Sequence, residues 1–330
     1  MNIIQRPDQY SYASTMKDYL IDSDKTITFS VKYNSKVILE EDYSPDANYQ
    51  IRIRDLGKLC RLALWGIWPT ADQTIQGNVA GNFTFAIDGT DDITATVAFT
   101  RMLTKNNAMT GFTNGCFLSN VFKKITCKGV QEWITAVLPA GKIVEAAPIL
   151  ADGSKGTVKA LTTAGETLSI ITIDVSAEKI FPNQDITGYS LYIGNTVFQY
   201  VIEKSPVMDL QVFRYKNLFD VPETIICRGG IEVKGANEST TGEVHEITRK
   251  LTVKNKNEYT AKAGAIYLQS DYKLWHDLMN AQEVDMLYDG EWYPIIIDKH
   301  EYSRNSRGKL ETLSFTFNLA NPEAANIILL

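Results

Sequence analysis

A hairpin signal near the C-terminus constrains the fold of this chain more than any other feature. The dipeptide Asp289-Gly290 separates two strand-like runs, 284–288 and 292–300, and it suits the positive φ angles of a type I′ turn. After a polar turn, apolar and polar side chains alternate from Leu313 to Leu319, which is the period of a strand with one buried face. The segment therefore predicts antiparallel β structure.

A short helix is predicted just before this hairpin. Apolar side chains recur at helical spacing over residues 271–279, and Ser270 or Asp271 can accept hydrogen bonds from the first free amides. Within the second strand of the hairpin, Pro294 has no amide hydrogen to donate to a ladder. We therefore expect an edge strand or a bulge at that position.

The N-terminal third shows the same two-residue alternation. Apolar and polar residues alternate from Thr26 to Tyr33, and a second Asp-Gly hairpin is centred on Asp88-Gly89. Between them, leucines at helical spacing follow Asp55, which predicts one short helix with an Asp cap. The pattern favours a β-sandwich for this region.

The chain is long enough for more than one domain. At 330 residues it exceeds the usual size of a single domain. We predict a mainly β protein of several antiparallel β-sandwiches with a few short helices. The expected divisions are an N-terminal β-sandwich over 1–126, a middle β module over 127–210, and a C-terminal β domain over 211–330 with the helix at 271–279 and the closing hairpins.

Composition argues against several classes of function. The net charge of −6 and the pI near 5.3 disfavour a nucleic-acid surface over the whole molecule. No apolar run reaches the roughly 18 residues that a membrane helix needs, and the first residues lack the apolar stretch of a secretory signal. The four cysteines are widely spaced, and the sequence contains no phosphate-binding loop or zinc motif. We expect no cofactor, no metal, no membrane and no nucleic acid.

Two acidic clusters have alternative interpretations. Asp285, Asp289, Glu291 and Asp298 surround the last hairpin, and two carboxylates at a suitable separation could hydrolyse a glycoside. Asp88, Asp91 and Asp92, in and after the second hairpin turn, could supply oxygen ligands to calcium. In both clusters, turn chemistry and a wet strand face explain the residues better. We assign no catalytic residue.

Aromatic side chains mark candidate interfaces. The run Leu64 to Pro69 is apolar and aromatic and leads into a polar stretch, and the region after Gln211 is dense in aromatics. The interface or binding candidates are Trp65, Ile67, Trp68, Phe213, Tyr215, Phe219 and Trp292.

Four segments together resemble tail-associated structural proteins of phages and prophages that infect Bacteroidetes. They are Ile4-Gln5-Arg6-Pro7, the hairpin from Thr26 to Pro45, the stretch from Phe213 to Thr224, and the module from Trp275 to Leu319. The resemblance implies a non-enzymatic virion protein similar to distal tail or baseplate proteins. It would assemble in the host cytoplasm without a signal peptide and form a ring or adaptor in the tail.

The resemblance also implies partners. The chain would contact itself in a closed homo-oligomer, a hexamer by analogy with other tails, and it would contact other phage tail proteins. Two alternatives remain open. One is a carbohydrate-binding or adhesive surface protein of a Bacteroides-like bacterium that presents tryptophans to glycans, and the other is a glycoside-active enzyme.

Overall fold

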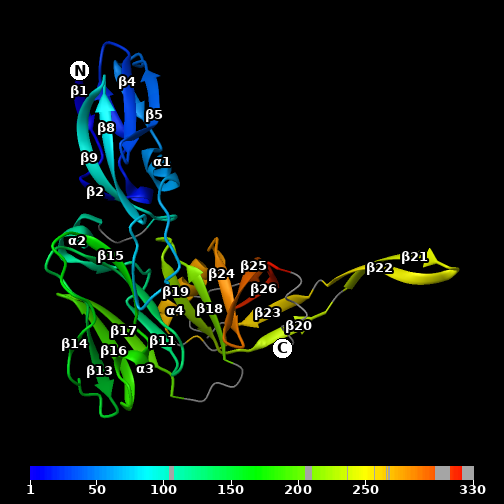
Figure 1. Ribbon diagram of the computed structural model, residues 1–330. Coiled ribbons are helices and arrows are strands. Elements are labelled where there is room, and N and C mark those ends of the chain that lie inside the picture. Colours follow the sequence, from blue (N-terminus) through cyan, green and yellow to red (C-terminus); the bar gives the residue numbers. More distant parts are fainter. Residues whose placement is uncertain are drawn as a thin grey trace, which may run out of the picture.

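The computed structural model describes residues 1–103, 108–204, 210–235, 237–255, 257–264, 266, 268–301 and 313–321. In these residues the chain is mainly β, and its sheets form two sandwiches and a half-barrel, as the sequence predicts for the fold class. Figure 1 shows the first sandwich standing on the other two units, with one long hairpin projecting to the side. Two strand pairs in the described residues are parallel, which the alternation pattern did not indicate. They are β2 (Tyr10–Tyr12) with β9 (Thr90–Ala98), and β11 (Lys123–Thr126) with β17 (Thr196–Ile202).

The first sandwich packs a five-stranded sheet, in the order β2-β9-β8-β4-β5, on a three-stranded sheet, β1-β3-β6. Tyr19 of the smaller sheet meets Phe29 of the larger one at a ring-centroid distance of 5.1 Å, and both are fully buried. The elements are β1 (Asn2–Gln5), β2 (Tyr10–Tyr12), a 3-10 turn η1 (Ala13–Thr15), β3 (Tyr19–Asp22), β4 (Ile27–Tyr33), β5 (Lys36–Tyr43), β6 (Gln50–Ile53), α1 (Leu56–Leu62), β8 (Ala80–Ile87) and β9 (Thr90–Ala98).

The second sandwich draws strands from both sides of a predicted boundary. Its sheets run β10-β12-β15-β7 and β11-β17-β16-β13-β14. The strands are β7 (Gln73–Ile75), β10 (Cys116–Phe117), β11 (Lys123–Thr126), β12 (Trp133–Leu138), β13 (Glu145–Leu150), β14 (Lys159–Ala160), β15 (Ser169–Asp174), β16 (Ile186–Ile193) and β17 (Thr196–Ile202), with helices α2 (Ala108–Asn114) and α3 (Ala177–Ile180). Because β10 and β11 pair only inside this unit, residues 116–126 belong to its sheets and not to the first sandwich, whereas Ala108 and Phe112 of α2 are buried with the core of the first sandwich. Strand β7 lies within the predicted N-terminal domain in sequence but belongs to this unit, since it pairs with β15.

The third unit is a seven-stranded half-barrel in the order β19-β18-β24-β25-β26-β23-β20, and one helix covers one of its faces. Trp275 of that helix lies 5.9 Å from Phe315 of the sheet, measured between ring centroids. The elements are β18 (Gln211–Lys216), β19 (Pro222–Cys227), β20 (Ile231–Lys234), β23 (Glu258–Lys262), α4 (Gln269–Met279), β24 (Val284–Tyr288), β25 (Glu291–Glu301) and β26 (Ser314–Leu319).

The predicted hairpin turns are present, with φ values of 49° and 82° at Asp289 and Gly290, and of 50° and 75° at Asp88 and Gly89. Two local predictions are wrong. Helix α4 begins at Gln269 after Leu268, with no side-chain cap, and Asp55 before α1 adopts a left-handed conformation and caps nothing with its side chain.

Pro294 lies in β25, which is an inner strand and not an edge. Its carbonyl accepts from the amide of Ala320, one residue past the end of β26. The missing amide hydrogen of Pro294 therefore falls where the neighbouring strand stops, and an inner strand tolerates it.

A two-stranded arm interrupts the half-barrel between β20 and β23. It consists of β21 (Asn237–Val244) and β22 (Ile247–Asn255), which pair only with each other. Figure 1 shows the arm reaching far from the rest of the molecule. Its tip residues, His245 and Glu246, have φ values of 52° and 62°, so the turn has the backbone of type I′ without the Asn or Gly that normally signals it.

Candidate interface surfaces

The aromatic loop from Leu64 to Pro69 is held rigidly while two of its side chains remain exposed. Trp65 is 49% exposed and Ile67 is 40% exposed. The amide of Ile67 donates to Gln76 Oε1 at 2.9 Å, and Gln76 Nε2 donates back to the carbonyl of Ile67 at 2.9 Å. The amide of Gly66 donates to Asp220 Oδ2 at 2.8 Å. The loop therefore presents its apolar side chains on a fixed backbone.

Trp68 and Trp292, two of the predicted candidates, meet across Arg214. The guanidinium carbon of Arg214 lies 4.5 Å from the ring centroid of each tryptophan, and Arg214 Nε donates to Asp285 Oδ2 at 2.7 Å. Cation–π contacts of this kind stabilise by roughly 0.5–2 kcal/mol each. This stack ties the loop to the half-barrel. A sugar could stack on the facing sides of these rings only by displacing Arg214.

The turn between β18 and β19, residues 217–221, joins all three units. Its apolar residues Leu218, Phe219 and Val221 are buried with the core of the first sandwich, although they belong to the half-barrel in sequence. Asn217 Nδ2 donates to the carbonyl of Leu118, in the second unit, at 2.8 Å. The guanidinium of Arg101 donates to the carbonyl of Lys216 just before this turn, at 2.8 Å, and to the carbonyl of Asn217 and Asp220 Oδ1 within it, at 3.0 and 3.2 Å.

Several carboxyl groups are buried around this junction. Glu223 accepts from Ser119 and Asn217 at 2.9 Å each, and burial raises its pKa. Burial and the nearby Glu223 raise the pKa of Asp277 to about 7, although Asp277 accepts the amide of Leu218 at 3.1 Å. None of these groups lines the cavities described below, so we interpret them as parts of the junction and not as catalytic acids.

A buried ion pair lies inside the middle unit. Lys124 Nζ and Glu132 Oε2 are 2.6 Å apart, with side-chain exposures of 1% and 0%. Burial raises the pKa of Glu132, and Lys124 opposes that shift. Because the pair is sealed from solvent, it cannot act on a substrate in this structure.

In the acidic clusters that suggested glycoside hydrolysis or calcium binding, the carboxylates have structural roles within the chain. Asp285 is paired with Arg214, and Asp289 forms the tight turn. In the other cluster, Asp91 pairs with Lys32 at 2.8 Å. Among the residues the structure describes, no group of three or more histidine, cysteine or acidic side chains is arranged to hold a metal.

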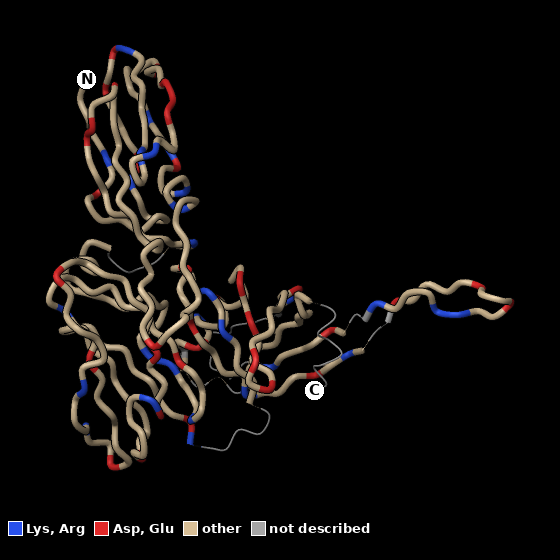
Figure 2. The backbone as a smooth tube through the Cα atoms, in the orientation of Figure 1, with Lys and Arg blue, Asp and Glu red and all other residues tan. Residues whose placement is uncertain are grey.

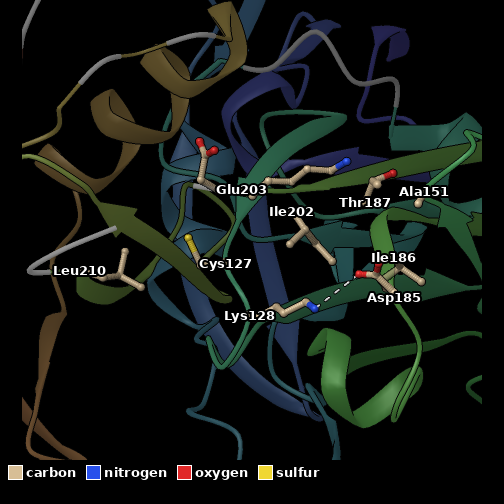
Figure 3. Close-up of a pocket in the computed structure, with 10 residues that line it drawn as sticks. Cys127, Lys128, Ala151, Asp185, Ile186, Thr187, Ile202, Glu203 and Leu210 are labelled. Carbon is tan, nitrogen blue, oxygen red and sulfur yellow. Dashed lines mark ion pairs between the residues drawn. The ribbon is translucent and has the colours of Figure 1, made fainter. Parts of the chain in front are cut away.

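Two cavities of about 500 Å³ open on the second unit. Figure 3 shows the first, of about 510 Å³, whose lining includes Cys127 and Glu203 and an ion pair between Lys128 and Asp185, 3.7 Å apart. The second lies beside α2 and the β16–β17 turn, and its rim carries Phe122, which is 60% exposed. Neither has converging catalytic groups. None of the helices in the described parts is long and apolar enough to cross a membrane.

The structure separates the predicted candidates into two groups. Trp65 and Ile67 are exposed, and Trp68 and Trp292 are partly exposed. Phe213, Tyr215 and Phe219 are 0% exposed, which corrects their assignment as interface residues. Alternation along β18 turns Phe213 and Tyr215 toward α4, and Phe219 enters the first sandwich. Aromatic density alone did not distinguish these core positions from surface ones.

The arm was not predicted from the sequence, and several of its apolar side chains are exposed. Leu251 lies over Gly242, where an added Cβ would come within 2.5 Å of a Leu251 methyl group. The exposed apolar residues of the arm are Val244 (38%), Ile247 (56%), Leu251 (59%) and Val253 (53%). The available signal was the alternation of apolar and polar residues in the second strand, where Ile247, Leu251 and Val253 share the two-residue period of a strand.

Comparisons with known proteins identify no family. No family model matches the chain, and no curated protein matches it. Nine chains of solved structures match, among them the crystal structure of the I9–I11 tandem from titin, with 12% identity over 97% of this chain and 90% of that chain and a TM-score of 0.17. At that TM-score the similarity supports no argument about function.

Proposed function

We propose that this chain is a non-enzymatic structural protein of a phage tail or baseplate, which forms a ring or adaptor by assembling with copies of itself. The arm is the observation that carries the proposal. An isolated two-stranded hairpin is marginally stable in water, and this one extends from the body with its apolar side chains exposed. A neighbouring subunit that covers those side chains would stabilise it.

The body of the molecule suits a mechanical role. The middle sandwich and the half-barrel share one continuous hydrophobic core, and the turn at 217–221 connects that core to the first sandwich. Such a body keeps its faces in fixed positions, while the exposed Trp65 and Ile67 offer a second apolar contact. The resemblance described above supplies the phage tail as the setting.

The arm can be removed without disturbing the strands that carry it. Strands β20 and β23 already pair with each other, with Lys234 opposite Glu258. Replacing residues 235–257 by Asn-Gly should therefore leave a tight hairpin of the favoured type. This variant is the matched control for self-assembly.

Mass photometry and negative-stain electron microscopy of both proteins test the proposal. We expect the full chain to form closed particles, six subunits by the analogy with tails, and the variant without the arm to remain monomeric. A full chain that stays monomeric at micromolar concentration would overturn the proposal.

A further inference from the structure

The longest free strand edge of the body is acidic. Strand β5 has eight residues and lies at the edge of its sheet, whereas the other edge strands of the body sheets in the described residues have two to six. Glu40, Glu41 and Asp42 follow one another along it, and all three are exposed. An unpaired edge of this length is a template for another strand. Its charge opposes pairing with an identical edge.

The second strand of the arm has the opposite charge. Strand β22 has nine residues, and its outer edge is also unpaired. It carries Arg249, Lys250 and Lys254, all exposed. Strand β21 carries Glu238 and Glu243 instead. Of the two arm strands, only β22 is therefore complementary in charge to an acidic edge.

We propose that β22 of one copy adds as a strand to the acidic edge of β5 in a second copy. The two strands match in length and are complementary in charge, and main-chain hydrogen bonds between them would satisfy both free edges. Within one chain, the arm projects away from the first sandwich, as Figure 2 shows, so β22 reaches the β5 edge of a different copy. The inference rests on the proposed self-assembly and names the surfaces that perform it.

Charge reversal on each surface tests this pairing. The first variant carries Glu40→Lys, Glu41→Lys and Asp42→Lys, and the second carries Arg249→Glu, Lys250→Glu and Lys254→Glu. Each variant alone should bring like charges together and weaken assembly by about 100-fold. Mixed in equal amounts, each variant offers the strand that fits the other, so we expect assembly to return.

A third variant controls for total charge. Asp24→Lys, Glu166→Lys and Glu291→Lys make the same change in net charge as the first variant at exposed positions outside β5 and the arm, and this variant should assemble like the unmodified chain. Mass photometry of all samples at one salt concentration measures the fraction of subunits that are assembled in each. Assembly of the first two variants on their own, or failure of their mixture to assemble, overturns the strand pairing while leaving self-assembly intact. An unmodified chain that is monomeric overturns the proposed function as well.

Discussion

Gly66 shows how one residue fixes the candidate loop. A Cβ at this position would come within 1.7 Å of the carbonyl oxygen of Asp220, which is backbone and cannot swing away. We therefore expect Gly66→Ala to lower the free energy of unfolding by about 1–3 kcal/mol or more. Gly77→Ala is the matched control, because nothing lies within 4 Å of its added Cβ. Urea titration of both variants measures the difference, and equal stabilities would contradict the close approach.

Asp277 makes the stability of the junction depend on pH. Its pKa of about 7 lies above the ordinary value near 3.8 because the side chain is buried and Glu223 is close. The folded chain thus holds a proton that the unfolded chain releases, so the stabilisation is complete below about pH 4 and is lost as the pH rises through 7. Asp277→Asn stays neutral and keeps an oxygen for the amide of Leu218.

We expect the variant to lose less stability than the unmodified chain between pH 5 and pH 8. The difference should be on the order of 1 kcal/mol or more, since each unit of pKa corresponds to about 1.4 kcal/mol. Urea titrations at the two pH values measure it, with the exposed Asp24→Asn as control. A parallel pH dependence of Asp277→Asn and the unmodified chain would show that Asp277 does not titrate in this range.

Among the elements, the arm should contribute little to the stability of the body. The two arm strands form a separate sheet, and their apolar side chains stay exposed. Replacing residues 235–257 by Asn-Gly should change the melting temperature of the dilute monomer by no more than a few degrees. Differential scanning calorimetry measures this. A large drop would mean that the arm packs on the body. A monomeric state of the variant without the arm could then result from a damaged body instead of a lost subunit contact.

The elements also show what the sequence could predict. The turns at Asp88-Gly89 and Asp289-Gly290 could be predicted because a type I′ turn requires positive φ at both positions, which few residue pairs adopt easily. The tip of the arm was missed because His245 and Glu246 adopt the same backbone without that signature. Strand β7 was missed for another reason, since only its distant partner β15 makes its three residues a strand. Long-range pairing leaves no local trace.

The part of the candidate surface that has a local sequence signal was predictable, and the part that depends on long-range contacts was not. Trp65 and Trp68 stand out because an apolar loop leads into polar sequence, and the structure leaves both at least partly exposed. The stacking of Trp68 and Trp292 on Arg214 depends on three segments far apart in the chain. Phe219 has equally strong aromatic character but is buried, because the turn that carries it enters another unit's core.

For the whole molecule, the turn at 217–221 couples the half-barrel to the first sandwich. Phe219 belongs to the half-barrel in sequence, yet its ring lies 5.5 Å from that of Tyr12 in the first sandwich, measured between centroids. Phe219→Ala should leave a cavity that costs about 3–5 kcal/mol. Because the lost contacts join two units, we expect the first sandwich and the half-barrel to lose stability together.

Hydrogen exchange followed by mass spectrometry resolves where that loss occurs. In Phe219→Ala, protection should fall both in β2, which carries Tyr12, and in β18 and β19, which flank the turn. Phe29→Ala is the matched control, since it leaves a cavity of similar size inside the first sandwich, away from the turn, and should spare the half-barrel. If Phe219→Ala instead leaves the protection of β2 unchanged, the units are coupled elsewhere. A subunit that moves as one rigid body is what a load-bearing ring requires, so this result also bears on the proposed role in a tail.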